Sequence, residues 1–326
     1  MVEVTAVIPN YNQRELLEAA LETIRRQTRP FAEICVVDNG SSDDSVETAR
    51  KLGARVLTSE RNEGFSRAVN RGIREARGAC IAVLNNDVEI DARWLELLLE
   101  EMESTGAWFA TGKIVRRDRP DILDGTYDEI SRAGCAWRCG EGRKDGPEWN
   151  APRDIAFAPL TAAVFRRELF ERVGVLDEEF ESYLEDIDLG LRCATAGLRG
   201  RYVPSAMVRH GGSATLGCWS PAKVRLIARN QVLLVAKHFP RRWWRGHGWP
   251  VVAGQLLWGL VAARHGAGAA YLKGKWEGLR RFRRARERSD PPPVLASLLA
   301  ESEARIRRVQ EVTGFDWYWR LYFAIT

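Results

Sequence analysis

The sequence predicts an α/β fold built on a parallel sheet that carries helices on both faces. Short, continuous apolar runs alternate with segments of helical period through the first third of the chain. Strands that are buried on both faces of a sheet have this continuous pattern, and a helix between them allows parallel pairing. The expected strands are 4–8, 34–37, 55–57 and 80–84, and the expected helices are 14–27, one from about 44, 66–75 and 94–102.

Local signals support these elements in order. Pro9 ends the first strand, and Leu17, Leu21 and Ile24 then recur at the spacing of one helical face. After the second strand, Asp44 and the glutamate three residues later have the separation of a capping box, which marks a helix start. The third and fourth strands are short apolar runs, and each is followed by a segment of helical period.

The pattern changes after residue 115. Residues 116–153 are polar and rich in glycine, and we expect a long loop over the site there. Regular patterning resumes at 155–165, and residues 289–293 form a proline-rich break. The further expected helices are 167–173, 185–196, 221–239 and 294–312.

Positive charge is concentrated in one segment. The chain has 326 residues and a net charge of +5, but residues 241–288 hold 12 Lys and Arg against two Glu, so this segment is +10 and the rest is −5. Five of the 12 tryptophans lie in it. Basic charge mixed with Trp favours contact with an anionic membrane surface. A solvated face or a homo-oligomer contact is the alternative, and no nucleic-acid module surrounds the segment.

Cysteine usage and apolar run lengths indicate the compartment. Six cysteines in a chain of this length are too dilute for a disulfide scaffold, so we expect a reduced, cytosolic protein. A structural zinc at Cys135 and Cys139 is an alternative, although no second Cys or His pair stands nearby at zinc-site spacing. The N-terminus lacks a basic n-region, so we expect no secretory signal. The longest uncharged apolar run, 249–263, is shorter than the ~18 residues of a membrane span.

Polar clusters follow three of the predicted strands. They lie at 9–12, 38–44 and 85–87. Each could be an ordinary turn, but the carboxyl ends of parallel strands meet at one edge of a sheet, where ligands bind. The chain has neither G-x-G-x-x-G nor G-x-x-x-x-G-K-[ST], which argues against a dinucleotide dehydrogenase and a P-loop enzyme.

The chain resembles the inverting family-2 glycosyltransferases of the A-type nucleotide-sugar fold, and most closely the bacterial rhamnosyltransferases. The resemblance covers about residues 2–215 and implies a Rossmann-like nucleotide-sugar-binding sheet with a helical, basic C-terminal extension. Five stretches carry it in the family's order: Val-Ile-Pro-Asn-Tyr-Asn at 7–12, Val-Val-Asp-Asn-Gly-Ser-Ser-Asp at 36–43, Asn-Glu-Gly-Phe at 62–65, Leu-Asn-Asn-Asp at 84–87 and Tyr-Leu-Glu-Asp-Ile-Asp-Leu at 183–189.

The resemblance implies a nucleotide site in the first half of the chain. In the family, the aspartate that corresponds to Asp38 recognises the pyrimidine base, and Tyr11 would pack on that base. Asn62 and Gly64 would lie near the ribose and the diphosphate. The complete set of implied nucleotide-binding residues is Pro9, Tyr11, Asn12, Asp38, Asn39, Asn62, Gly64 and Asn86.

The resemblance also implies a metal and a catalytic base. The family's Asp-x-Asp motif stands here as Asn-Asn-Asp, so Asp87 is the remaining carboxylate for Mg²⁺ or Mn²⁺. His210 resembles the family's histidine that contacts the diphosphate or the metal, with a structural role as the alternative. Asp186 corresponds to the base that deprotonates the acceptor hydroxyl, and Glu185 is the alternative base because the two differ by ~100° around a helix.

These observations together predict an inverting transferase that moves one sugar. L-rhamnose from dTDP-rhamnose is the favoured donor, with a UDP-sugar also compatible, and the acceptor is a hydroxyl of a lipid-linked or cell-surface polysaccharide. Residues 1–220 would form the catalytic domain, with a nucleotide-binding half (1–115) and an acceptor half (116–220). Residues 221–326 would form a helical region that contacts either the inner face of the cell membrane or another copy of the chain. A non-catalytic sugar-nucleotide-binding or membrane-scaffolding protein of the same fold is the alternative.

Overall fold

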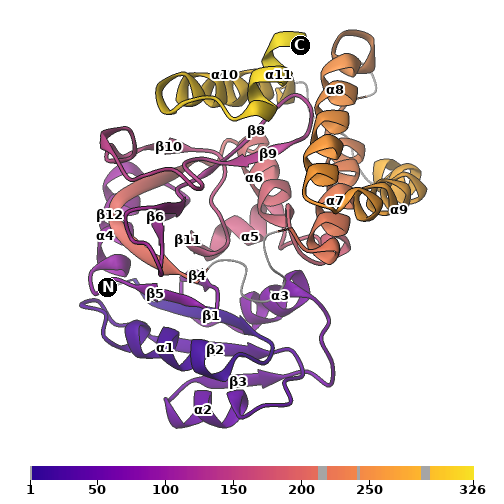
Figure 1. Cartoon of the computed structure of the whole chain (residues 1–326). Coiled ribbons are helices and arrows are strands. Elements are labelled where there is room, and N and C mark those ends of the chain that lie inside the picture. Colours follow the sequence, from indigo (N-terminus) through magenta and orange to yellow (C-terminus); the bar gives the residue numbers. More distant parts are fainter. Residues whose placement is uncertain (1, 212–218, 241–242, 288–293) are drawn as a thin grey trace. The chain divides into compact units, whose positions relative to one another are not determined.

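The computed structural model describes residues 2–211, 219–240, 243–287 and 294–326, without the side chains of 243–247 and 287. The chain divides into two compact units. Unit 1 comprises Met1–Tyr127 and Gly140–Gly212, and unit 2 comprises Asp128–Cys139 and Ser213–Thr326 (Figure 1). The predicted break at 289–293 lies outside the described residues. The predicted boundary at residue 220, between a catalytic domain and a helical C-terminal region, remains a prediction.

The first half of unit 1 alternates strand and helix as predicted. Strands β4, β1, β2 and β3 lie side by side in this order and are all parallel (Figure 1). Asn10, the last residue of β1, is in register with Asp38, the last residue of β2. The elements are β1 (Val4–Asn10), α1 (Arg14–Arg25), β2 (Glu33–Asp38), α2 (Ser45–Lys51), β3 (Arg55–Thr58), α3 (Phe65–Glu75) and β4 (Cys80–Leu84).

The rest of unit 1 makes the sheet mixed rather than wholly parallel. Strand β11 is antiparallel to both of its neighbours, β4 and β6, while β12 is parallel to β6. The order across the sheet is β10-β12-β6-β11-β4-β1-β2-β3. The additional elements are β5 (Val88–Ile90), α4 (Trp94–Thr105), β6 (Phe109–Arg116), β7 (Leu123–Gly125), β10 (Arg153–Ile155), β11 (Ala162–Arg166), α5 (Arg167–Val173), α6 (Glu185–Thr195) and β12 (Gly200–His210).

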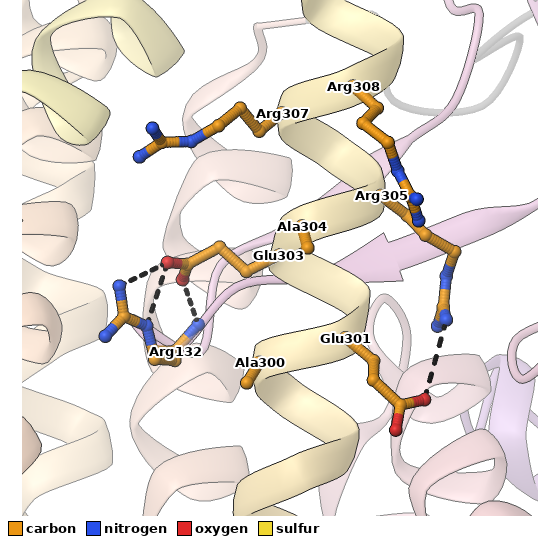
Figure 2. A pocket seen from close by; sticks show the side chains of 8 residues that line it. All are labelled: Arg132, Ala300, Glu301, Glu303, Ala304, Arg305, Arg307 and Arg308. Atoms are coloured by element: carbon orange, nitrogen blue, oxygen red, sulfur yellow. Dashed lines mark hydrogen bonds and ion pairs between the residues drawn. The ribbon is translucent and has the colours of Figure 1, made fainter.

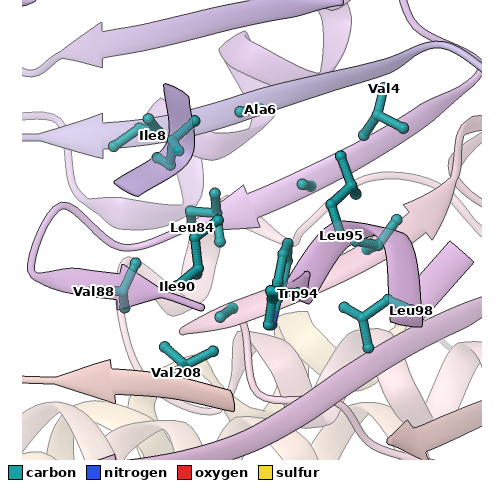
Figure 3. Close-up of a cluster of buried hydrophobic side chains, with 14 of the residues drawn as sticks. Val4, Ala6, Ile8, Leu84, Val88, Ile90, Trp94, Leu95, Leu98 and Val208 are labelled. Carbon is teal, nitrogen blue, oxygen red and sulfur yellow. The ribbon is translucent and has the colours of Figure 1, made fainter. Parts of the chain in front are cut away.

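One buried cluster of unit 1 joins the two parts of this sheet. Trp94 and Leu98 of α4 pack among side chains from β1, β4 and β12, including Val4, Leu84 and Val208 (Figure 3). These five residues are fully buried or nearly so. Each such side chain contributes roughly 1.5–3 kcal/mol through burial. The cluster therefore holds the strands, and with them the strand ends, in fixed positions.

The prediction of a long loop at 116–153 is wrong. This stretch contains β7, β8 (Asp128–Ile130), β9 (Ala136–Arg138), a short 3-10 helix (Pro147–Trp149) and β10. Strands β8 and β9 form an antiparallel hairpin that belongs to unit 2. Strands of three residues are too short to give a periodic signal, and the glycines between them resemble a loop.

Unit 2 is helical around the β8–β9 hairpin. The structure adds a last helix, α11, that the sequence did not predict. The backbone amide of Ile130 donates to Ser302 Oγ at 2.8 Å, and Arg132 pairs with Glu303 at 2.6 Å, so the hairpin is fixed to α10. The helices are α7 (Pro221–His238), α8 (Trp243–Arg264), α9 (Gly268–Glu287), α10 (Leu295–Thr313) and α11 (Trp317–Ile325).

Helix α9 packs on α7 through glycines. A Cβ at Gly274 would lie 2.2 Å from the carbonyl oxygen of Arg225, and one at Gly278 would lie 2.8 Å from that of Arg229. The two helices can approach this closely only because these side chains are absent.

A half-buried lysine lies between α7, α8 and α9. Lys275 Nζ donates to Gln231 Oε1 at 2.8 Å and to Gln255 Oε1, and it lies 5.2 Å from the centre of the Tyr271 ring. Burial lowers the pKa of Lys275 to about 7. The ammonium group is therefore partly deprotonated near neutral pH.

Replacing Lys275 by Met should change how stability depends on pH. The pKa of Lys275 is about 7 in the folded protein against 10.5 for a lysine in water, so between these values the unfolded chain binds one more proton than the folded chain. The contribution of Lys275 to the free energy of unfolding is therefore lowest below pH 7, where the buried charge is present in full, and it rises with pH above 7. The Lys275→Met variant should lose this rise, which is about 1 kcal/mol per pH unit.

Urea unfolding at three pH values between 6.5 and 9.5 measures this slope. Lys273→Met is the matched control, because Lys273 is exposed on the same helix. It should keep the slope of the parent protein. Equal slopes for the parent protein and Lys275→Met would contradict the prediction.

Candidate functional site

Side chains at the ends of β1, β2 and β4 form one hydrogen-bonded group. Asn10 Nδ2 donates to Asp38 Oδ1 at 3.3 Å, and Asn86 Nδ2 donates to Asn10 Oδ1 at 2.7 Å. The backbone amide of Asn39 donates to the carbonyl of Asn10 at 2.8 Å. Asn10 and Asp38 are both 2% exposed. The three strand ends are thus fixed to one another, as the sequence predicted for a common edge.

Ser41 connects Asp38 to the loop that follows β1. Its hydroxyl donates to Asp38 Oδ1 at 2.5 Å and accepts the backbone N–H of Asn12 at 2.7 Å. In return, Asn12 Oδ1 accepts the backbone N–H of Ser42 at 3.0 Å. Asn12 and Gln13 have positive φ angles of 54° and 73°, an uncommon conformation for residues other than glycine. These hydrogen bonds hold the loop in that conformation.

Asn39 fixes the loop between β3 and α3. Its side-chain amide donates to Asn62 Oδ1 and to the carbonyl of Gly64, both at 3.1 Å, and its oxygen accepts the N–H of Glu63 at 3.2 Å. Gly64 has a φ of 92°, which favours glycine. A single buried amide therefore holds three consecutive residues, 62–64, in place.

The segment before α6 meets the same loop. The backbone N–H of Ser66 donates to the carbonyl of Glu181 at 3.0 Å, and a Cβ at Gly64 would lie 3.3 Å from that carbonyl. Glu181, Tyr183 and Leu184 all have positive φ angles between 60° and 70°. Three such residues in four positions store backbone strain, which is concentrated at functional sites in proteins.

The acidic residues of α6 lie in different environments. Glu185 is 6% exposed and Asp188 is fully buried, where it pairs with Arg192 at 2.9 Å. Asp186 is more exposed, and its Oδ1 accepts the backbone N–H of Ile187 at 2.8 Å. Asp188 therefore has a structural partner within its own helix, while Asp186 is the more accessible of the two predicted bases.

Asp87 lies beside His210 and Asp124. His210 Nε2 is 3.2 Å from Asp87 Oδ1, and His210 Nδ1 is 2.8 Å from Asp124 Oδ2. Burial alone would lower the pKa of His210, but the hydrogen bonds to the two carboxylates outweigh it and raise this pKa to about 9. Both ring nitrogens are engaged, so His210 holds Asp87 in place. The carbonyl of Asp87 also accepts from Arg117 Nη2 at 2.8 Å.

The structure thus gathers the predicted nucleotide-binding residues at one edge of unit 1. Hydrogen bonds through Asn10, Ser41 and Asn39 join six of the eight predicted nucleotide-binding residues. Pro9 and Tyr11 flank Asn10 in the chain, and Tyr11 is 39% exposed. Asp87 directly follows Asn86, and the contact of Glu181 with Ser66 connects this edge to the segment that leads to Asp186. The roles of all these residues remain predictions. The six nucleotide-binding residues joined by hydrogen bonds are Asn12, Asp38, Asn39, Asn62, Gly64 and Asn86.

Sequence reasoning missed three participants. Asp124 lies in the stretch expected to be a loop, and a single aspartate there gives no signal. Ser41 belongs to a motif, but its link to Asn12 depends on contacts between residues 29 positions apart. Glu181 contributes a backbone carbonyl, which residue types do not reveal.

The donor set for a cation can be assessed from the same residues. In the described part of the chain, no group of three or more His, Cys, Asp and Glu side chains has the arrangement of a metal site. The buried side-chain oxygen of Asn85 has no hydrogen-bond partner among the described residues. Asn85 and Asp87 are two residues apart in the sequence, and an amide oxygen and a carboxylate are donors of the type that fits Mg²⁺ or Mn²⁺ when phosphate and water supply the other ligands.

A hollow of about 580 Å³ lies on α10 in unit 2 and contains none of the predicted residues (Figure 2). Glu303 binds Arg132 within it, and Glu301 lies 3.9 Å from Arg305. These ion pairs belong to the framework of unit 2.

The parallel strands with polar residues at their carboxyl ends define a nucleotide-binding α/β protein. A family model described as glycosyl transferase family 2 matches residues 5–174, just over half of the chain. The chain belongs to this family. It is an inverting glycosyltransferase with the GT-A fold, as the sequence motifs predicted.

Relatives and solved structures agree with this assignment. An N-acetylglucosaminyl-diphospho-decaprenol L-rhamnosyltransferase of Mycobacterium tuberculosis is 28% identical over 277 residues, which cover 75% of this chain and 88% of that protein. GalNAc-T7 with UDP, GalNAc and Mn²⁺ has a TM-score of 0.63 at 15% identity and covers 96% of this chain and 58% of its own. The mannosyltransferase PcManGT from Pyrobaculum calidifontis with GDP-Man and Mn²⁺ has a TM-score of 0.53 at 18% identity and covers 99% and 86%.

Replacing Asn39 by Ala should weaken nucleotide binding through the loop that it fixes. The change removes the three hydrogen bonds by which Asn39 positions residues 62–64, so we expect about a tenfold loss of affinity for the nucleoside diphosphate. Isothermal titration calorimetry with Mn²⁺ present measures it. Asn230→Ala, which removes a buried asparagine of unit 2, should leave this affinity unchanged. An unchanged affinity in Asn39→Ala would separate this loop from the nucleotide site.

Proposed function

We propose that this protein transfers one L-rhamnose from dTDP-L-rhamnose to a hydroxyl of a lipid-linked acceptor. The observation that carries the choice of donor and acceptor is the 28% identity to the mycobacterial rhamnosyltransferase, which extends over 75% of the chain and so beyond the family model. The site geometry supports the transfer itself. The hydrogen-bonded ends of β1, β2 and β4 provide a rigid surface for the nucleotide, and the acidic first turn of α6 provides a separate group for the acceptor.

The nucleotide would bind at the ends of β1, β2 and β4. Asp38 is held by Asn10 and Ser41, so a base that bonds to this turn would meet a fixed partner. The exposed ring of Tyr11 supports stacking on the base. Binding energy gained on such a prepared surface is not lost to ordering the loop.

Asp186 is the proposed base. It lies in the first turn of α6 and is more exposed than Glu185, so an acceptor hydroxyl can approach it. A base contributes about 10²–10⁴ to the rate when it lies within hydrogen-bond reach of the proton that it removes. The strained backbone of Tyr183 and Leu184 would set the direction in which Asp186 points.

Asp87, supported by Asn85, would hold the Mg²⁺ or Mn²⁺, and a bound divalent cation neutralises charge that develops on the departing diphosphate. His210 and Asp124 keep the Asp87 carboxylate oriented through the contacts at 3.2 Å and 2.8 Å. His210 would thus act on Asp87 or, as the resemblance implies, touch the diphosphate itself.

The acceptor places the reaction at a membrane. A lipid-linked acceptor presents its sugar at the inner face of the cell membrane, where the basic segment 241–288 would meet anionic headgroups. Among the helices that the structure describes, none combines the length and hydropathy needed to cross a bilayer.

Two substitutions separate the proposed roles of the acidic residues. Asp186→Asn should lower the transfer rate by at least about 100-fold while nucleotide affinity stays the same, because it removes a base and not a donor contact. Asp87→Ala should lower both the rate and the Mn²⁺-dependent part of nucleotide binding. Asp154→Asn, at an exposed surface carboxylate, is the control. Full turnover in both test variants would contradict the assignment of these residues.

A donor screen tests the choice of sugar nucleotide. We expect dTDP-L-rhamnose with Mn²⁺ to raise the melting temperature more than UDP- or GDP-sugars do, since a ligand that binds only the folded state stabilises it. Release of dTDP should then depend on a polyprenyl-diphosphate N-acetylglucosamine acceptor. Turnover of another sugar nucleotide, with none of dTDP-L-rhamnose, would rule out the proposed donor.

A further inference from the structure

Helices α8 and α9 of unit 2 carry large apolar side chains that face solvent. Seven of them are between 44% and 67% exposed, and we call this set the α8–α9 face. In α8 they recur at intervals of three or four residues, and in α9 likewise, so each helix has one apolar stripe. The set consists of Trp249, Val252, Leu256 and Leu260 from α8 and Leu272, Trp276 and Leu279 from α9.

The two helices form an antiparallel hairpin. Gly268 lies against Ala263, Gly259 lies against Tyr271, and Lys275 bonds to Gln255. The partner numbers fall along α8 as they rise along α9, which is the pattern of antiparallel neighbours. The stripes can therefore be compared by their angular distance from the line of contact.

Both stripes lie on the same side of this hairpin. Counting about 100° per residue, the stripe of α8 is centred about 85° beyond its contact residues Gln255 and Gly259, and the stripe of α9 about 85° beyond Tyr271 and Lys275. Since the helices run in opposite directions, equal rotations of the same sign bring the stripes to one common side. Helix α7 contacts α9 through Gly274 and Gly278, away from this side.

The surroundings of the α8–α9 face are basic. Exposed Arg283 lies within the stripe of α9 by the same count, and exposed Arg264 and Arg280 lie about 75° from the stripe centres of α8 and α9. The Arg280 guanidinium stacks 4.5 Å from the centre of the Trp276 ring. The sequence has no Asp or Glu between residues 188 and 277. Glu277 itself pairs with Arg225 at 2.7 Å. A partner for this face must therefore be apolar and negatively charged at the same time.

We propose that the α8–α9 face docks onto a bilayer of anionic phospholipid. Its apolar side chains would lie at the boundary between headgroups and acyl chains, and its arginines would lie at the phosphates. A helix surface of Trp and Leu with a basic rim has this preference. A second copy of the chain fits less well, because a two-fold contact would bring the basic rims together. The proposal deepens the proposed function, on which it rests for the presence of a lipid-linked acceptor.

Sedimentation of the full chain with vesicles tests the proposal. Binding to phosphatidylcholine vesicles that contain about one third phosphatidylglycerol should exceed binding to pure phosphatidylcholine. Leu256→Ser combined with Leu272→Ser should lower the partition coefficient about tenfold or more, because it removes apolar area from both stripes. Arg264→Gln combined with Arg280→Gln should lower it about fivefold for each charge, and only on anionic vesicles.

Matched controls keep the result specific. Val312→Ser removes a more exposed apolar side chain from α10, and Arg50→Gln removes an exposed charge from α2, and neither should change binding. Because the substituted residues are exposed, melting temperatures should stay within about 2 °C of the parent protein, which shows that the variants fold.

Three results would overturn the proposal. They are no binding to anionic vesicles, binding that the face variants do not alter, and a face variant that converts a dimer to a monomer in analytical ultracentrifugation without changing vesicle binding. The vesicle-binding assays contain neither the sugar-nucleotide donor nor the acceptor, so they test docking separately from transfer. Failed vesicle binding with intact turnover on a water-soluble acceptor would therefore refute docking alone, and vesicle binding without turnover of any sugar nucleotide would refute the proposed function alone.

Discussion

The hydrogen bonds of Asn10 are the constraint on which the candidate site depends. The buried side chain of Asn10 bonds to Asp38 at the end of β2 and to Asn86 after β4, and its backbone carbonyl accepts the backbone N–H of Asn39. Asn39 in turn fixes residues 62–64, which meet the carbonyl of Glu181 ahead of α6. Elements far apart in the chain are thereby ordered by a few amide groups, each of which is costly to leave without a partner once buried.

The nucleotide edge could be predicted from sequence because its signals are local. A continuous apolar run followed at once by Asn, Asp or Ser marks both the strand and the position of its polar end, as at Asn10 and Asp38. Strand direction has no such local mark, so the antiparallel β11 was not anticipated. Asp124 and the carbonyl of Glu181 enter the site through contacts with residues more than 80 positions away, which no spacing encodes.

Helical regions show the same division between local and distant information. The starts of α7 and α6 were predicted within a residue, since Ser220 caps α7 and acids begin α6. Helix α11 is short, and its sequence is rich in aromatic residues, which are as common in strands as in helices. Its stability comes from packing, with Tyr318, Trp319 and Tyr322 buried in a cluster with Leu257 and Ile306. Tertiary packing, and not intrinsic propensity, makes such a segment helical.

The β8–β9 hairpin has a consequence for how this gene can be divided. Because residues 128–139 leave unit 1 and return to it, the backbone passes between the units at three points and not one. Cutting the chain near residue 213 would deprive α10 of Arg132 and Ile130, and would leave the excised hairpin without Ser302 and Glu303. The two units therefore cannot be exchanged by a single cut in the chain. A chimera with a related enzyme would have to keep the inserted hairpin, residues 128–139, together with the helices after residue 213.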